Sequence, residues 1–299
     1  MSNTKLKIVL AFFAIYIVWG STYLFNKIAV TELPPLFLAA IRFFVAGVLM
    51  ILFAIYKKAS FKLTKKEFLN LCIAGFLFLI YGNSIYIWAL QFIDSGIAAL
   101  IAATQPLFVL LFMGIFLKKP IKRTSIIGIF LGILGMYLLV SQQSFASNSK
   151  TVIGVFAMLS CVLSWSSGSV FVAKARFPKN FLVSSAIQML FAGVVLTILS
   201  LLFNETWSSP EVWSSRVLFS MFFLIVFGGF IAFTAFNYLL RIVSPDKVAT
   251  SAYVNPVIAL IIGWYVLDEK LSTQSIIASF VLLTGVYFIT SKKLDEKSK

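Results

Sequence analysis

Long apolar segments separated by short polar turns recur along the whole chain. A helix needs about 20 apolar residues to cross a lipid bilayer, and ten segments of about that length can be marked. They cover residues 8–28, 35–56, 68–92, 96–117, 124–140, 152–175, 181–203, 217–241, 247–267 and 273–291. The pattern predicts an all-α polytopic membrane protein with ten transmembrane helices.

Two of these apolar runs carry a proline near the middle. Pro106 follows Gln105 in the fourth segment, and Pro256 follows Asn255 in the ninth. A proline inside a helix removes a backbone hydrogen bond and bends or breaks the helix. Within a membrane this is tolerated where neighbours or a cavity satisfy the freed backbone groups. Interrupted segments at matching places in two halves indicate a binding site between repeats.

The two halves of the chain match each other in register. At an offset of 146 the first two segments match the sixth and seventh, and at 150 the fourth and fifth match the ninth and tenth. The matched pairs include Trp19 with Trp165, Gly47 with Gly193, Pro106 with Pro256, and Gly135 with Gly285. Each half holds five segments, an odd number, so the second half enters the membrane from the opposite side. This predicts two inverted repeats over residues 1–141 and 151–291, followed by a short cytoplasmic tail at 292–299.

Composition and charge agree with a membrane protein. The chain is 61% hydrophobic, 12% charged and has a mean hydropathy of +1.00, whereas soluble domains carry about 25% charged residues. The net charge of +15 has a topological explanation and needs no nucleic acid partner. With the N-terminus inside, twenty Lys and Arg fall on the inner side and four on the outer side. Cytoplasmic loops collect these residues, so both termini are expected in the cytoplasm. Because the first segment lacks a clear small-residue cleavage site and further spans follow, we expect it to be a transmembrane helix and not a signal peptide.

Several kinds of chemistry are excluded or disfavoured. The chain has no histidine, its two cysteines (Cys72 and Cys161) lie in apolar runs, and it has no P-loop pattern. We therefore expect no metal, no cofactor and no enzymatic activity. A membrane enzyme, such as a lipid-modifying transferase, would need a polar catalytic cluster that the sequence lacks. A channel is the other alternative, and the paired prolines in two matching halves favour alternating access instead.

Ordered short motifs give the chain a family resemblance. They are Trp19-Gly-Ser-Thr-Tyr23 with Lys27, Arg42-Phe-Phe, Tyr86-Ile-Trp-Ala-Leu-Gln91, Gln105-Pro-Leu-Phe108, Asn255-Pro-Val-Ile258 and Asp268-Glu-Lys-Leu271. In this order on ten segments, the halves resemble the EamA domain of the drug/metabolite transporter superfamily. One departure is that Lys118-Lys119 stands where such domains often carry an acidic turn like Asp268-Glu269.

The resemblance implies a secondary transporter of the inner membrane. Its substrates would be small organic solutes such as amino acids, metabolites or drug-like compounds, and its direction would be export. A metabolite exchanger or importer is the alternative. The expected partners are the substrate and the lipid bilayer, and the chain would act as a monomer or a homodimer.

Two basic residues are the first candidates for a substrate site. Arg42 falls inside the second segment, where a charged side chain is costly and usually faces the bundle interior. It could bind a substrate carboxylate, or it could be a structural arginine held by carbonyl groups. Lys27 falls near the outer end of the first segment. It could join Arg42 at an anion site, although a place at the membrane interface is the favoured interpretation.

Aromatic and amide side chains complete the candidate set. Polar-tipped aromatic residues are typical of small-molecule sites, and the candidates are Trp19, Tyr23, Tyr86, Trp165 and Tyr253. The candidate amides are Asn83, Gln105, Gln188, Asn237 and Asn255. Ordinary packing and hydrogen bonds between helices are the alternative roles for both sets. Pro106 and Pro256 are expected to act as hinges or packing residues.

No acidic residue falls deep within any predicted span. Proton relays in pumps use buried carboxylates or histidines. We therefore expect facilitated or exchange transport without such a relay.

Overall fold

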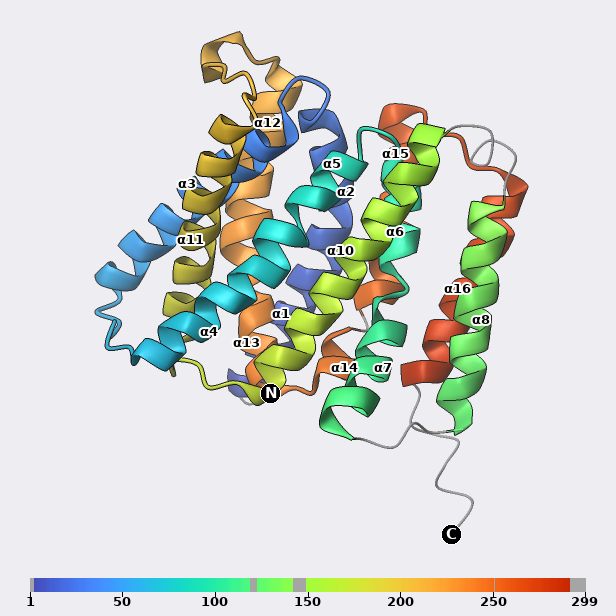
Figure 1. Cartoon of the computed structure of the whole chain (residues 1–299), viewed down its shortest axis with the longest axis horizontal. Helices are drawn as coiled ribbons and strands as arrows, with labels where there is room; N and C mark the ends of the chain where they lie inside the picture. The colour runs from blue at the N-terminus through green and yellow to red at the C-terminus, as the bar shows by residue number, and fades with distance from the viewer. Residues whose placement is uncertain (1–2, 119–122, 142–148, 250, 291–299) are drawn as a thin grey trace.

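The computed structural model describes residues 3–118, 123–141, 149–249 and 251–290, and these residues form helices and turns without any strand. The helices up to residue 140 are α1 (Asn3–Phe13), η1 (Ala14–Val18), α2 (Trp19–Ala29), α3 (Pro35–Tyr56), α4 (Lys65–Gly75), η2 (Phe76–Tyr81), α5 (Ser84–Ala89), α6 (Ser95–Ala102), α7 (Gln105–Leu117) and α8 (Arg123–Val140). The later helices are α10 (Ser149–Lys174), α11 (Phe181–Leu202), η3 (Pro210–Val212), α12 (Ser215–Phe223), η4 (Leu224–Phe233), α13 (Thr234–Ile242), α14 (Pro245–Val248), α15 (Ser251–Leu267) and α16 (Thr273–Thr290). Figure 1 shows the longer helices running between the same two ends of the molecule.

The predicted all-α class is confirmed. Seven continuous helical stretches among the described residues are long and apolar enough to cross a membrane, the first being Lys5–Ala29 and the last Ser215–Ile242. Three further apolar helices are shorter: Ser125–Leu139, Val254–Leu267 and Thr273–Gly285. These three coincide with the predicted fifth, ninth and tenth spans, and the full count of ten membrane crossings stays a prediction.

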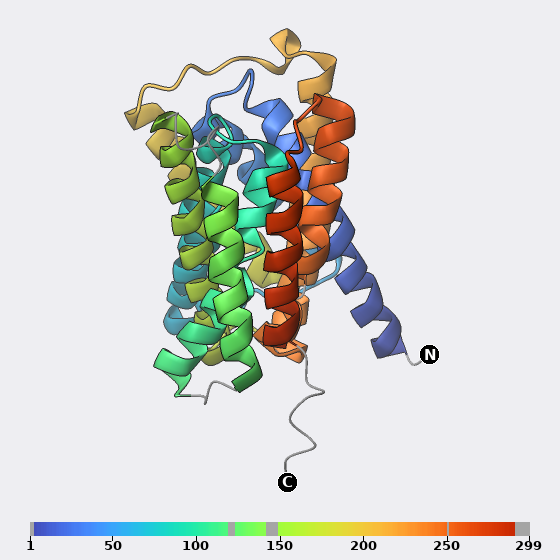
Figure 2. The same ribbon diagram turned by 90° about the vertical axis from the view of Figure 1, so that its right-hand side faces the viewer.

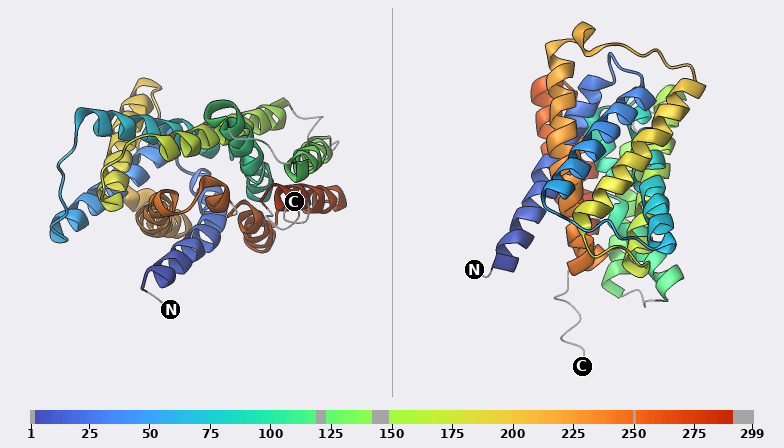
Figure 3. Two further views of the ribbon diagram at one scale, coloured as in Figure 1. Left: turned by 90° about the horizontal axis from the view of Figure 1, so that it is seen from below. Right: turned by 90° about the vertical axis from the view of Figure 1, so that its left-hand side faces the viewer.

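The two ends of the molecule are distinguished by the helices that begin there. We call the end at which α1 begins and α16 ends the lower end, as it is drawn in Figure 1, and the opposite end the upper end. Helices α3, α6 and α10 begin at the upper end, whereas α4, α11 and α14 begin at the lower end. The matching helices of the two halves, α3 and α11, therefore point in opposite directions (Figure 3).

Two pairs of matching helices stand at the two extremes of the long axis. α3 packs along α11 at one extreme, and α8 packs along α16 at the other (Figures 1 and 2). Glycines permit the close approach in both. A β-carbon on Gly193 would lie 2.5 Å from the backbone nitrogen of Phe44, and one on Gly47 would lie 2.7 Å from that of Leu190. Small residues at such crossings are typical of helix packing in membranes.

The same arrangement recurs at α8 and α16. A β-carbon on Gly135 would lie 2.8 Å from the backbone nitrogen of Leu282, and one on Gly285 would lie 2.8 Å from that of Gly132. The later residue of α8 thus meets the earlier residue of α16, which is the antiparallel order that α3 and α11 also show. The glycines that were matched in the sequence, Gly47 with Gly193 and Gly135 with Gly285, therefore also make equivalent contacts in the structure.

Four left-handed residues end matching helices. Lys58 and Asn204 have φ of 52° and 54°, and Lys118 and Asp268 have φ of 52° and 54°. Each follows the end of a long helix, where a left-handed residue satisfies the last carbonyl groups. The spacings, 146 and 150 residues, are the offsets at which the two halves match.

Non-α stretches interrupt the helices around the centre. η1, η2 and η4 are π-helical, and each joins two α-helices of one continuous apolar stretch. The chain also breaks between α6 and α7, so that Pro106 lies in the first turn of α7. In the second half α14 ends at Val248, and Pro256 lies inside α15. The helix break of the second half therefore lies further ahead of Pro256 than the break of the first half lies ahead of Pro106.

Candidate functional site

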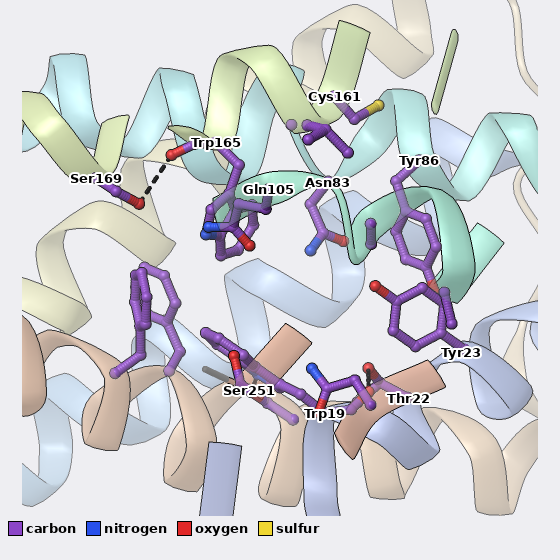
Figure 4. Close-up of a pocket in the computed structure, with 18 of the residues that line it drawn as sticks. Trp19, Thr22, Tyr23, Asn83, Tyr86, Gln105, Cys161, Trp165, Ser169 and Ser251 are labelled. Atoms are coloured by element: carbon purple, nitrogen blue, oxygen red, sulfur yellow. Dashed lines mark hydrogen bonds between the residues drawn. The ribbon is translucent and has the colours of Figure 1, made fainter. Parts of the chain in front are cut away.

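A cavity lies at the centre of the bundle, between the two pairs of matching helices. It has a volume of about 110 Å³ accessible to water-sized molecules. Nine of the predicted site residues line it: Trp19, Tyr23, Arg42, Asn83, Tyr86, Gln105, Trp165, Asn255 and Pro256. In Figure 4, Asn83 and Gln105 project into the open space from one side, and Trp19 and Thr22 lie on the opposite side.

The cavity reaches further toward one end than the other. Ser169, Leu240, Pro245 and Val248 line it near the lower end. The first turn of α6 at the upper end does not contribute, and there α6 packs directly on α15. Among the described residues, the lining of the cavity therefore extends further toward the lower end than toward the upper end.

Arg42 is buried at this cavity and has amide partners. Its side chain is 3% exposed, and Nη1 donates to Asn26 Oδ1 at 3.0 Å and to Asn83 Oδ1 at 3.3 Å. The guanidinium carbon stands 4.9 Å from the centre of the Phe43 ring, and Nε has no hydrogen-bond partner among the described residues. A buried donor without a partner is costly, so the guanidinium keeps a capacity to bind an acceptor.

The second half repeats this geometry without the charge. Gln188 matches Arg42 at the offset of 146, and its Nε2 donates to Asn237 Oδ1 at 3.3 Å. Both side chains are buried, and neither lines the cavity. Each half thus has a long polar side chain on its second apolar segment (α3 or α11) that is hydrogen-bonded to an asparagine on its third segment. Only the first half presents a cation there.

Aromatic rings form another part of the cavity wall. Trp19 and Trp165 stand edge to face, with centroids 5.7 Å apart. Phe236 packs on both, at 5.0 Å from Trp19 and 5.8 Å from Trp165. The indole N–H of Trp19 donates to Gly228 O at 3.3 Å, whereas that of Trp165 has no hydrogen-bond partner among the described residues.

Tyr23 and Tyr86 lie at the upper limit of the cavity. Their rings meet edge to face, with centroids 5.3 Å apart. Figure 4 shows the two side chains next to each other at one side of the cavity. Lys27, one turn above Tyr23, does not line the cavity. Its Nζ donates to Leu90 O at 2.7 Å and Ile93 O at 2.8 Å. The structure therefore places Lys27 on the last carbonyl groups of the α5 segment, apart from Arg42.

Asp94 lies in the turn between α5 and α6, where the charges of Lys27 and Glu269 act on its carboxyl group. Burial raises the pKa of the Asp94 carboxyl, nearby Glu269 raises it further, and Lys27 opposes both. None of the described residues that line the cavity is acidic.

The amides beside the two prolines differ in their surroundings. Gln105 lies at the break between α6 and α7 and lines the cavity, whereas Pro106 does not. Asn255, oriented to satisfy both ends of its amide, donates to Tyr16 O at 2.8 Å and Ile15 O at 3.2 Å. These carbonyl groups belong to the π-helical turn η1. The side chain of Tyr253 lies outside the described part of the structure.

Several lining residues were absent from the sequence-based set. Thr22, Cys161, Ser169 and Phe236 line the cavity, and Asn26, fully buried, supplies the closest hydrogen bond to Arg42. Asn26 is polar within an apolar run, which is a usable signal. The π-helical turns have no comparable signal, although such turns occur frequently at functional sites.

The fold and the cavity define a helical membrane protein with a polar, cationic centre, and the comparisons with known proteins agree. The chain belongs to the EamA-like transporter family, whose sequence profile matches residues 6–141 and 152–291. It is similar to the uncharacterized inner membrane transporter YedA of Escherichia coli K12, with 36% identity over 95% of this chain and 90% of the relative. The uncharacterized transporter YoaV of Bacillus subtilis is 22% identical over 95% of this chain and 97% of its own.

A solved structure supports the fold. It aligns with a TM-score of 0.70 at 20% sequence identity, covering 95% of this chain and 97% of the other. At this identity the likeness concerns the fold alone. Together the findings establish a membrane transporter of the EamA-like family, as the sequence motifs implied.

Proposed function

We propose that the chain is a secondary transporter that exports small organic solutes bearing a carboxylate, by alternating access between two inverted five-span halves. The observation that carries the substrate chemistry is Arg42. It is a buried cation at the cavity, its described partners are neutral amides, and no described lining residue is acidic. A buried charge without a counter-ion is costly, and a bound carboxylate would supply the missing one through a charge-assisted pair.

The direction of transport rests on the end of the bundle toward which the cavity lining extends. The basic residues at the ends of the helices gather at the lower end, as Lys57, Lys118 and Lys174 do. Because cytoplasmic loops collect basic residues, we place the lower end and both termini in the cytoplasm. A cavity whose lining extends toward that end is suited to take up substrate from the cytoplasm, the step with which export begins. A metabolite exchanger or importer would use the same inward-facing shape to release its substrate.

The two matching pairs of helices support the mechanism. α3 with α11 and α8 with α16 are packed backbone to backbone at glycines, so they form rigid edges. The broken helices α6–α7 and α14–α15 line the cavity between them. Interrupted helices at the centre of inverted repeats are the usual place of substrate binding in secondary transporters.

The test is counterflow in proteoliposomes with a panel of carboxylate, zwitterionic, neutral and cationic solutes. The informative variant is Arg42→Gln, since Gln188 shows that glutamine fits beside an asparagine at the matching place. Loss of a charged hydrogen bond, about 1.5–3 kcal/mol, should weaken carboxylate binding by about tenfold or more. Uptake of a neutral member of the panel should change little. Equal carboxylate transport by Arg42→Gln and the parent protein would remove Arg42 from the site.

A further inference from the structure

Two glutamates of the second half reach across to helices of the first half at the upper end. Glu269, in the turn after α15, accepts hydrogen bonds from the backbone N–H groups of Ser95 at 2.8 Å and Gly96 at 3.1 Å. These are the first two residues of α6. Glu269 is 9% exposed. A carboxylate there satisfies N–H groups that lack partners within the helix and interacts favourably with the helix dipole.

Glu205 makes the corresponding contact with α3. Its carboxylate oxygens accept from Leu36 N at 3.0 Å and from Phe37 N at 2.6 Å. The residue before the helix is Pro34, which has no side chain able to cap it. Each helix of the first half that begins at the upper end beside the second half, α3 and α6, is therefore capped by a carboxylate of that half.

The matching positions at the lower end lack both carboxylates. Glu205 matches Ala59 at the offset of 146, and Glu269 matches Lys119 at the offset of 150. One of the two donors is missing as well, because Ser95 matches Pro245, and a proline has no N–H group. α11 is capped within its own half, by Asn180 Oδ1 accepting from Leu182 N at 2.9 Å. Among the described residues, carboxylate caps between the two halves thus occur at the upper end alone.

Helix packing is also closer at the upper end than the sequence favours at the matching place of the lower end. A β-carbon on Gly96 would lie 2.5 Å from Leu260 Cδ2, and one on Gly263 would overlap Glu269 Oε2 and lie 2.8 Å from Ser95 Oγ. α6 and α15 therefore meet closely just where Glu269 caps α6. In the sequence these two glycines match Asp246 and Met113. Both are larger residue types, so the sequence does not favour an equally close contact at the lower end.

We propose that Glu269, supported by Glu205, is a latch that holds the upper end closed, so that the resting transporter opens at the lower end. This inference rests on the proposed alternating-access transport. Opening the upper end separates α6 from α15, and the Ser95 and Gly96 N–H groups then lose a charged acceptor. The asymmetry of the two ends sets the resting state, and the release of Glu269 is a step of each transport cycle.

The experiment reads the open end directly, without substrate. Cys161 lines the cavity and Cys72 does not, so a Cys72→Ser background leaves one reporter thiol. A membrane-impermeant maleimide is applied to each face of the membrane in turn, using intact cells and inverted vesicles. In the parent, labelling should come from the face at the lower end. Glu269→Gln should accelerate labelling from the upper face by about tenfold, the effect expected from losing one charged hydrogen bond.

Two further variants make the result specific. Asp268→Asn removes the neighbouring charge and keeps a residue that tolerates the left-handed conformation, and it should leave labelling unchanged. Ser95→Pro copies the matching Pro245 and removes one donor at the first helical position, where proline is tolerated. It should act in the same direction as Glu269→Gln, which covers the case in which that variant does not fold.

Equal upper-face labelling in the parent, Glu269→Gln and Ser95→Pro would overturn the latch. Its failure is distinguishable from failure of the proposed function. Counterflow by the parent protein measures transport, whereas labelling of Cys161 measures only which end is open.

Discussion

Trp19 and Trp165 occupy matching positions in the two halves and meet each other edge to face, with ring centroids 5.7 Å apart and planes at 88°. Two matched residues touch each other only where the halves meet. The tryptophan pair therefore marks the centre of the molecule, and the cavity with Arg42 on its wall lies there. The two indoles nevertheless have different hydrogen bonds, and this difference leads to a prediction.

Trp165→Phe should weaken substrate binding, whereas Trp19→Phe should mainly lower stability. The Trp165 N–H has no partner among the described residues, so it remains available to a substrate in the cavity. The Trp19 N–H already donates to Gly228 O, and its loss should cost about 0.5–1.5 kcal/mol. Concentration-dependent counterflow and thermal unfolding in detergent separate the two effects. The interpretation fails if both variants change the same quantity equally.

Gly193→Ala should destabilise the protein by about 1–3 kcal/mol, the usual cost of overpacking. The added methyl group would lie 2.5 Å from Phe44 N and 2.6 Å from Phe44 Cα, which are backbone atoms that cannot move aside. Gly132→Ala is the matched control, because its methyl group would meet only the terminal Cδ1 of Leu107, at 3.0 Å. Thermal unfolding in detergent compares them. A Gly193→Ala protein as stable as Gly132→Ala would mean that the α3–α11 contact is loose.

The all-α class could be predicted from the sequence because the thickness of the bilayer imposes a length on each apolar run. Many of the residues that line the cavity could also be predicted from the sequence, since Trp19, Arg42 and Trp165 are polar or aromatic residues that stand out within apolar segments. That these side chains bind substrate stays a prediction. The Glu269 cap could not be predicted, because it joins residues 174 positions apart. The π-helical turns are equally hidden, and in η1 the carbonyl groups of Ile15 and Tyr16 accept hydrogen bonds from the distant Asn255 amide.

A disulfide between α6 and α15 should stop transport reversibly. In Gly96→Cys/Leu260→Cys the new β-carbon at 96 would lie 3.4 Å from the α-carbon at 260, and the leucine atoms that it would strike are removed. The β-carbon at 260 is one bond from that α-carbon, so the two β-carbons come close to the separation of about 3.5–4.5 Å that a disulfide needs. With Cys72 and Cys161 replaced, oxidation should abolish counterflow and reduction should restore it. Each single-cysteine variant serves as a control. Full counterflow in the oxidised double variant would show that α6 and α15 need not separate.

Flux should respond to membrane potential and not to a pH gradient when the substrate is a monoanion. None of the described lining residues can accept a proton as an Asp, Glu or His relay would, so no proton is expected to move with the substrate. Moving one charge across 100 mV is worth about 2.3 kcal/mol, which is about a 50-fold shift in the distribution of a monoanion at equilibrium.

A potassium gradient with valinomycin sets the potential, and buffers set the pH on each side. A zwitterionic substrate is the control, because its net charge is zero and its distribution should follow neither gradient. Accumulation that follows the pH gradient at zero potential would show that a proton is carried, and the carboxylates of the upper turn, Asp94 and Glu269, would then be the groups to examine for it.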